Sequence, residues 1–307
     1  MDDTPTGRLI TLHDGVVTAT IAPVGAALRG LTVDGVRVVP DYPHDVPAPG
    51  CAGTVLVPWP NRIRDGRWDD GRQQLAITEP KYGNASHGLL RYTEYAVASR
   101  SDASVTLAAD VYPQLGYPFW LRTRVTHAVE AAGVTVTHEV QNVGSASAPV
   151  GIGVHPYLTI DDPESPVSAD DILVRVPAAE YYLTDDRMLP TGVAPVAGTH
   201  ADVRDYRPLS QLTLDTGYRA TAAASGSRFE SVLKAPNGST VGLWQDASFG
   251  YVQVYTKPDF PGIDGPLATI AIEPMTCAAD AFNSGDGLRF LEPGDTFTAR
   301  WGITFAR

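Results

Sequence analysis

Apolar and polar side chains alternate with a period of two through much of the chain, which is typical of strands with one buried face. The segments that follow this pattern are 104–109, 121–129 and 134–140, and further strands are expected at 240–244, 251–255, 268–272 and 296–305. Helical periodicity is scarce, and a single helical turn is expected at 280–283. The pattern therefore predicts an all-β protein.

The N-terminal region has the pattern of a β-hairpin. Residues 16–23 form an apolar strand pattern that ends at a proline, and residues 25–33 form the next. Asp34 and Gly35 follow, and an Asp-Gly pair between apolar runs is a strong indication of a tight hairpin turn. Residues 36–39 are then expected to form the returning strand.

The spacing of turn residues predicts one large antiparallel β-sandwich that spans residues 1–307 as a single domain. The chain has 29 glycines and 25 prolines spread along its length, which suits many short strands joined by turns. Hydrophobic residues make up 43% of the sequence, enough for a sizeable core. Residues 160–210 are rich in Asp and Pro, and we expect them to be a loop-like excursion from the sandwich.

Net charge and cysteine content limit the binding partners and the cellular compartment that we expect. The net charge of -12 disfavours nucleic acid and anionic membrane surfaces. Residues 1–5 have neither the basic nor the apolar region of a signal peptide, and no segment is long enough to span a bilayer. The two cysteines, Cys51 and Cys277, fit a reducing cytoplasm and are expected to be buried thiols without a chemical role.

Two polar residues interrupt apolar segments in ways that suggest acid–base chemistry. Glu273 ends an apolar strand and precedes Pro274, which favours an extended conformation. Burial of a carboxylate is unfavourable unless it is paired, and it raises the pKa toward the range useful for a base. His155 follows the apolar, glycine-rich run 150–154, whose glycines permit close backbone packing.

Four further polar side chains are candidates for binding. His87 lies in a turn-rich segment that would present an imidazole from a loop. Arg62 and Asn61 follow Trp59, and a guanidinium beside an aromatic ring suits a sugar, with its hydroxyls and its C–H faces. Asp215 ends a short apolar run and suits either vicinal hydroxyls or a turn.

Other chemistries are disfavoured by spacing. Two histidines and a carboxylate also describe a metal-binding triad, but HxH, HxxxH and HExxH spacings are missing. The sequence has no dinucleotide-binding GxGxxG unit, no P-loop and no GxSxG motif. Glycoside hydrolysis would need two opposed carboxylates, such as Glu273 and Asp215, and would leave the histidines without a role.

Taken together, these segments resemble the aldose 1-epimerase (galactose mutarotase) family, and the resemblance runs through nearly the whole chain in order. Segment 214–218 and the Pro58-Trp59-Pro60 run are similar to the bacterial branch of the family. The segments that carry the resemblance are 19–26, 34–35, 61–63 with Gly66, 86–88, 116–118, 155–157, 251–256, 273–276 and 281–283.

The resemblance implies a galactose mutarotase-like supersandwich that interconverts the α and β anomers of a free aldose such as glucose or galactose. It implies no metal and no cofactor, with Glu273 as the base and His155 as the acid. An ionised carboxylate and a charged imidazolium are expected at neutral pH. The residues that would orient the sugar are His87, Arg62, Asp215 and Asn61.

Two alternatives stay open at this point. A hexose-phosphate (glucose-6-phosphate type) 1-epimerase would need a cluster of basic side chains, for which Arg64, Arg67, Arg72 and Arg91 are candidates. A non-catalytic sugar-binding module would tolerate loss of His155 or Glu273. The partner expected in each case is a small carbohydrate, and the protein is expected to be a monomer or homodimer.

Overall fold

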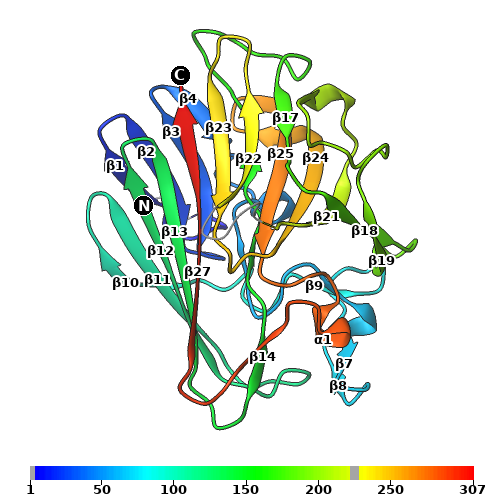
Figure 1. The fold of residues 1–307 in the computed structure, drawn as a ribbon. Helices are drawn as coiled ribbons and strands as arrows, with labels where there is room; N and C mark the ends of the chain where they lie inside the picture. The colour runs from blue at the N-terminus through cyan, green and yellow to red at the C-terminus, as the bar shows by residue number, and fades with distance from the viewer. Residues whose placement is uncertain (1–3, 222–227) are drawn as a thin grey trace.

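The computed structural model describes residues 4–221 and 228–307, and antiparallel strands make up most of their secondary structure (Figure 1). The expected all-β antiparallel architecture is therefore confirmed. Residues 1–3, which belong to the segment examined for a signal peptide, lie outside the described residues.

The largest sheet has nine strands and includes the regularly alternating segments. In β12, every second residue from Leu121 to Val129 is buried, as a half-buried strand requires. In spatial order its strands are β10 (Ala96–Arg100), β11 (Ser104–Val111), β12 (Leu121–Glu130), β13 (Gly133–Asn142), β27 (Thr296–Ala306), β23 (Thr240–Gln245), β22 (Phe229–Lys234), β17 (Leu173–Arg175) and β20 (Arg207–Pro208).

The second sheet has eight strands and is built around one long hairpin, β24 and β25. Strand β16 (Tyr157–Leu158) also pairs with β25, off the main strand order. In spatial order the strands are β19 (Pro190–Pro195), β18 (Glu180–Thr184), β21 (Asp215–Arg219), β24 (Tyr251–Gly262), β25 (Gly265–Met275), β15 (Gly153–Val154) and β5 (Val55–Leu56).

A four-stranded sheet at the N-terminus contains the hairpin predicted from Asp34 and Gly35. Its β1 and β2 contact β12, and its β4 contacts β16, so this sheet lies against both larger sheets. Both larger sheets and the N-terminal sheet contribute to one large cluster of buried apolar side chains. The strands are β1 (Ile10–Asp14), β2 (Val17–Ala22), β3 (Ala27–Val33) and β4 (Val36–Val39).

The interpretation of residues 160–210 as a loop-like excursion is wrong. This segment contributes β17 and β20 to the nine-stranded sheet and β18 and β19 to the eight-stranded sheet. These strands are two to six residues long, and only β18 has two adjacent buried side chains, Tyr181 and Tyr182. Short edge strands without alternation have no sequence pattern that separates them from loops.

Short elements gather beside the eight-stranded sheet, at the lower right of Figure 1. The expected helical turn is present as α1 (Ala281–Ser284). The remaining elements are the pairs β6 (Arg62–Ile63) with β9 (Ala85–Ser86), β7 (Arg67–Trp68) with β8 (Gln73–Gln74) and β14 (Ala148–Val150) with β26 (Arg289–Leu291), and the single-turn 3-10 helices η1 (Pro49–Cys51), η2 (Arg64–Gly66) and η3 (Leu209–Gln211).

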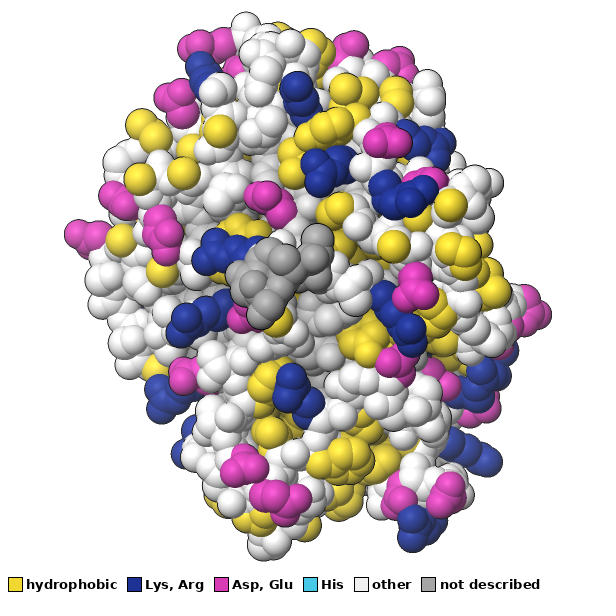
Figure 2. Space-filling view, viewed as in Figure 1, with side chains coloured by type: hydrophobic (Ala, Val, Ile, Leu, Met, Phe, Trp, Pro, Cys, Tyr) yellow, Lys and Arg dark blue, Asp and Glu magenta, His cyan; other side chains and the backbone are white. Residues whose placement is uncertain are grey.

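The molecular surface mixes charges of both signs. Figure 2 shows Lys and Arg side chains interspersed with Asp and Glu on the face that it presents. Such mixing offers no large field of one sign to guide a polyanion on that face. None of the helices in the described part of the chain is long and apolar enough to cross a membrane.

Candidate active site

One face of the eight-stranded sheet carries a row of polar side chains. Glu273 on β25 is the register partner of Gln253 on β24, which in turn is opposite Gly217 on β21. Residues directly opposite one another on neighbouring strands point to the same face. Asp215 lies two residues before Gly217 and so shares this face. A Cβ added at Gly217 would lie 3.1 Å from Gln253 Oε1, so the glycine leaves room for the side chain of Gln253.

Glu273 and His155 form a buried pair. His155 Nε2 lies 3.3 Å from Glu273 Oε1, and the two side chains are 8% and 3% exposed. The second carboxylate oxygen of Glu273, Oε2, is buried without a hydrogen-bond partner among the described residues. A buried polar atom without a partner is rare in folded proteins, so Oε2 is available to a ligand hydroxyl.

His155 lies between β15 and β16, and close backbone packing holds it there. Its N–H donates to Thr54 O at 3.2 Å, and its own carbonyl accepts from Gly53 N at 2.8 Å. A Cβ added at Gly153 would lie 2.5 Å from Pro60 Cβ. The glycine-rich run before His155 is therefore needed for close packing, as its sequence indicated.

Burial changes the charge of this pair. It lowers the pKa of His155 to about 4. Burial and, secondarily, the charge of Asp215 raise the pKa of Glu273 well above its ordinary value, with Arg62 acting in the opposite direction. Burial therefore favours the neutral form of both groups over the expected imidazolium beside a carboxylate. The two shifts favour a single proton on the pair, carried by Glu273.

Arg62 is held beside this pair by a bidentate contact. Its Nε and Nη2 donate to the two carboxylate oxygens of Glu79, each at 2.9 Å, and its Nη1 donates to Asn61 Oδ1 at 3.2 Å. Asn61 is buried and has a φ of 51°, a conformation that asparagine tolerates better than most residues. Glu79 thus fixes the orientation of the guanidinium.

His87 follows β9, whose Ser86 is paired in register with Arg62 on β6. Its backbone N–H donates to Asn61 O at 2.8 Å. Its ring centroid lies 5.7 Å from that of His155. Burial lowers the pKa of His87 well below its usual range, and the neighbouring His155 adds to this effect. We therefore expect a neutral imidazole that can both donate and accept hydrogen bonds.

The structure adds Gln253, which lies in the strand expected at 251–255 and was not among the candidate site residues. Its Nε2 donates to Asp215 Oδ1 at 2.6 Å, and its side chain stands beside that of Glu273. The amide thus holds Asp215 on this face of the sheet, next to the strand that carries Glu273. A glutamine in an alternating strand resembles any solvent-facing polar residue, so the sequence offered no sign of this position.

All six residues singled out from the sequence lie in one cluster of contacts. Asn61, Arg62, Asp215 and Gln253 line one hollow, together with Tyr182 and Met188. Glu273 and His155 adjoin it through Gln253 and the carboxylate–imidazole contact, and His87 through Asn61. Of the two cysteines, Cys277 is buried as expected, but Cys51 is partly exposed, which corrects that expectation.

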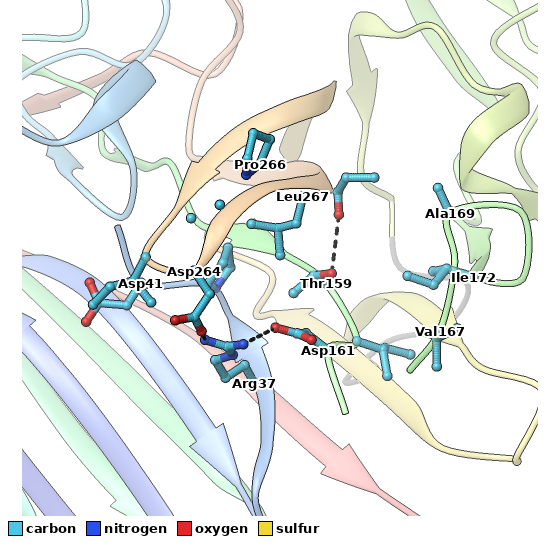
Figure 3. Close-up of a pocket in the computed structure, with 16 residues that line it drawn as sticks. Arg37, Asp41, Thr159, Asp161, Val167, Ala169, Ile172, Asp264, Pro266 and Leu267 are labelled. Atoms are coloured by element: carbon cyan, nitrogen blue, oxygen red, sulfur yellow. Dashed lines mark hydrogen bonds and ion pairs between the residues drawn. The ribbon is translucent and has the colours of Figure 1, made fainter. Parts of the chain in front are cut away.

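A larger cavity, of about 250 Å³, lies elsewhere (Figure 3). It is at the tip of the β24–β25 hairpin, and Ala268 in its lining is five residues from Glu273, or about 17 Å along an extended strand. Arg37 projects into it but already pairs with Asp161 and Asp264. Because its charged groups are already paired, this cavity offers less for chemistry than the cluster around Glu273.

Comparison with known proteins agrees with the family resemblance of the sequence motifs. The family model described as Aldose 1-epimerase matches residues 8–304. The chain is 34% identical over 293 residues to the uncharacterized protein YihR of Escherichia coli, and the match covers 94% of this chain and 90% of that protein.

Solved structures share the fold. A GalM/aldose epimerase homologue from C. elegans superimposes with a TM-score of 0.84 at 21% identity, covering 98% of this chain and 99% of that one. A galactose 1-epimerase from Lactobacillus acidophilus superimposes with a TM-score of 0.76 at 18% identity, covering 97% and 94%. These similarities extend over the complete sandwich rather than over one sheet.

Proposed function

Because the chain belongs to the aldose 1-epimerase family, we propose that it is a mutarotase that interconverts the α and β anomers of a free aldose such as glucose or galactose. The observation that carries the proposal is the buried 3.3 Å contact between His155 and Glu273 on a polar sheet face. Such a pair offers one group to accept a proton and one to donate it, which ring opening requires.

In the proposed reaction, the shared proton first moves from Glu273 to His155 across this contact. The carboxylate of Glu273 then takes the proton of the anomeric hydroxyl while the imidazolium of His155 protonates the ring oxygen. The bond between the anomeric carbon and the ring oxygen breaks, and an open-chain aldehyde forms. Rotation of the aldehyde and reversal of both transfers closes the ring as the other anomer, after which the proton on His155 returns to Glu273.

The remaining polar side chains orient the sugar. Arg62, fixed by Glu79, donates to hydroxyls, and Asp215, held by Gln253, accepts from them. His87 and Asn61 complete the contacts at the edge nearest His155. Holding the ring in one orientation lowers the entropic part of the barrier.

The proposed reaction needs no metal, no nucleotide and no covalent intermediate. The small number of cysteines leads us to propose the cytoplasm as the compartment. We further propose that residues 1–307 act as one domain, in a monomer or a homodimer.

The proposal is tested by polarimetry. The optical rotation of freshly dissolved α-D-glucose and α-D-galactose is followed with and without the protein, in the presence of a chelator. We expect faster decay with at least one sugar, unaffected by the chelator. An unchanged rate with both sugars contradicts the assignment to free aldoses, and acceleration abolished by the chelator contradicts the metal-free mechanism.

The structure weakens the hexose-phosphate alternative. Arg64 lies within 4 Å of Asp185 and Asp280, and Arg72 pairs with Asp69. Arg67 is exposed and bonds to Gln74. These three guanidinium groups therefore do not form the free basic cluster that a dianionic phosphate prefers. Competition between glucose and glucose 6-phosphate tests this alternative directly.

A further inference from the structure

Of the four candidate arginines, Arg91 and Arg67 pair with no carboxylate among residues 4–221 and 228–307, and of these two only Arg91 is partly buried. Its Nη1 donates to the carbonyl oxygen of Ser86 at 3.0 Å, and its guanidinium lies 4.9 Å from the centre of the Tyr92 ring. A guanidinium carries five N–H donors, so most of those on Arg91 are unused by these contacts. The side chain is half-buried rather than extended into solvent.

The position of Arg91 places this free cation at the edge of the candidate active site. Ser86, which holds it, immediately precedes His87 and is the register partner of Arg62. The charge of Arg91 contributes to the lowered pKa of His87. The Cys51 thiol, whose pKa is raised mainly by burial, is influenced by both Arg91 and Glu273. Arg91 and the buried pair therefore border the same small region.

A fixed guanidinium with free donors is suited to a ligand anion, since a bond between two charged groups is about twice as strong as a neutral one. One free arginine matches one negative charge, whereas a phosphate dianion would favour a cluster. We propose that Arg91 recognises a singly charged substituent, such as a carboxylate, on the aldose, so that acidic aldoses are preferred over neutral ones. This inference rests on the proposed function.

The test compares mutarotation of glucose, glucuronate and glucose 6-phosphate by the wild-type protein and by Arg91→Met. We expect wild-type kcat/KM for glucuronate to exceed that for glucose by at least about tenfold. In Arg91→Met the ratio of the two should fall by about 10–100-fold, mainly through KM for glucuronate. Arg67→Met, which removes an exposed arginine of β7 outside the cluster, should leave the ratio unchanged.

An equal loss with glucose and glucuronate in Arg91→Met would show a structural role and overturn the inference. A wild-type preference for glucose 6-phosphate over glucuronate would overturn the match to a single charge. If the protein accelerates none of the three sugars, the proposed function fails. Calorimetric titration of glucuronate into the wild type and Arg91→Met then decides the inference separately, since binding that depends on Arg91 supports it and equal or absent binding overturns it.

Discussion

At the scale of single residues, burial is the property that sets the chemistry of the candidate site. Glu273 has only 2% of its surface exposed, and its direct contact is with His155, while the guanidinium of Arg62 acts on it from nearby. Burial raises the pKa of a carboxyl group in such surroundings and lowers the pKa of an imidazolium, because it disfavours the charged form of each. Burial therefore widens the pH range in which Glu273 keeps a proton that His155 does not.

The pH profile of kcat/KM follows from this arrangement. We expect activity to fall on the acid side near pH 4, because the pKa of His155 is about 4 and protonation of its imidazole gives the pair a second proton. On the alkaline side activity should fall at the raised pKa of Glu273, where the last proton leaves the pair. A single transition centred near 6.5, the ordinary histidine pKa, would contradict the shared proton. Polarimetric rates between pH 3.5 and 10 measure the profile.

The sequence indicated which polar residues form the candidate site, but not their protonation states. Glu273 and His155 stood out because each interrupts an apolar segment before a proline. Their depth could not be predicted, because it depends on strands that are far apart in the sequence. Gln253 and Glu79 gave no pattern at all, since both act through a partner that only the fold brings near them.

At the scale of elements, tight turns determine where the site residues lie. His87 and Gly88 both have positive φ, 61° and 68°. A Cβ added at Gly88 would lie 2.3 Å from the carbonyl oxygen of Val57, and Leu89 N donates to the same oxygen. The turn that presents His87 is therefore pressed against the chain just before Asn61.

Gly88→Ala should consequently displace this turn. Gly71 is a matched control, because its φ of 79° is also positive but a Cβ there would meet nothing within 4 Å. We expect Gly71→Ala to cost about 1–2 kcal/mol from φ alone with activity kept. Gly88→Ala should lose more stability and at least about tenfold in kcat/KM. Equal melting temperatures and activities for the two variants would contradict the role of this turn.

The long β24–β25 hairpin shows how much of a strand the sequence pattern predicts. The pattern predicted strands at 251–255 and 268–272, and the structure extends them to Gly262 and back to Gly265. The extension contains a register irregularity between Lys257 and Phe260, which interrupts the alternation. The cores of both strands were thus predictable, but their ends were not.

At the scale of the whole molecule, the sandwich encloses titratable groups that have no part in the proposed reaction. His138 on β13 is fully buried, and its Nε2 accepts a hydrogen bond from Trp301 Nε1 at 2.9 Å on neighbouring β27. His127 on β12 contacts Ala26 O at 3.0 Å and so links the nine-stranded sheet to the N-terminal region. Burial lowers the pKa of His138 to about 3 and that of His127 to about 4.

These histidines should make the fold sensitive to mild acid. The unfolded chain binds protons below about pH 6.5 that the folded chain excludes until about pH 4, so the free energy of unfolding falls as the pH drops through this window. Between pH 7 and pH 5, the free energy of unfolding from urea titrations should fall by about 2 kcal/mol less in His138→Gln than in the wild type. The exposed His44→Gln serves as control. Equal losses in all three proteins would contradict this account.

The all-β antiparallel architecture was the feature best predicted from the sequence, because period-two alternation and turn residues are direct signs of antiparallel strands. The order of the strands was not predictable, since β17, β18, β19 and β20 are too short to show a pattern. The assignment of residues 1–307 to a single domain stays a prediction. The family match over residues 8–304 fits the resemblance noted from short motifs.

The most direct test of the proposed mutarotase is the rate of mutarotation by Glu273→Gln, measured by polarimetry beside the wild type and beside Glu139→Gln, an exposed carboxylate on β13. Glutamine keeps the shape of the side chain but cannot take a proton. We predict a loss of about 10²–10⁴-fold in kcat for Glu273→Gln with an unchanged circular dichroism spectrum, and wild-type rates for Glu139→Gln. A folded Glu273→Gln protein with near wild-type turnover would contradict the proposal that Glu273 is the base.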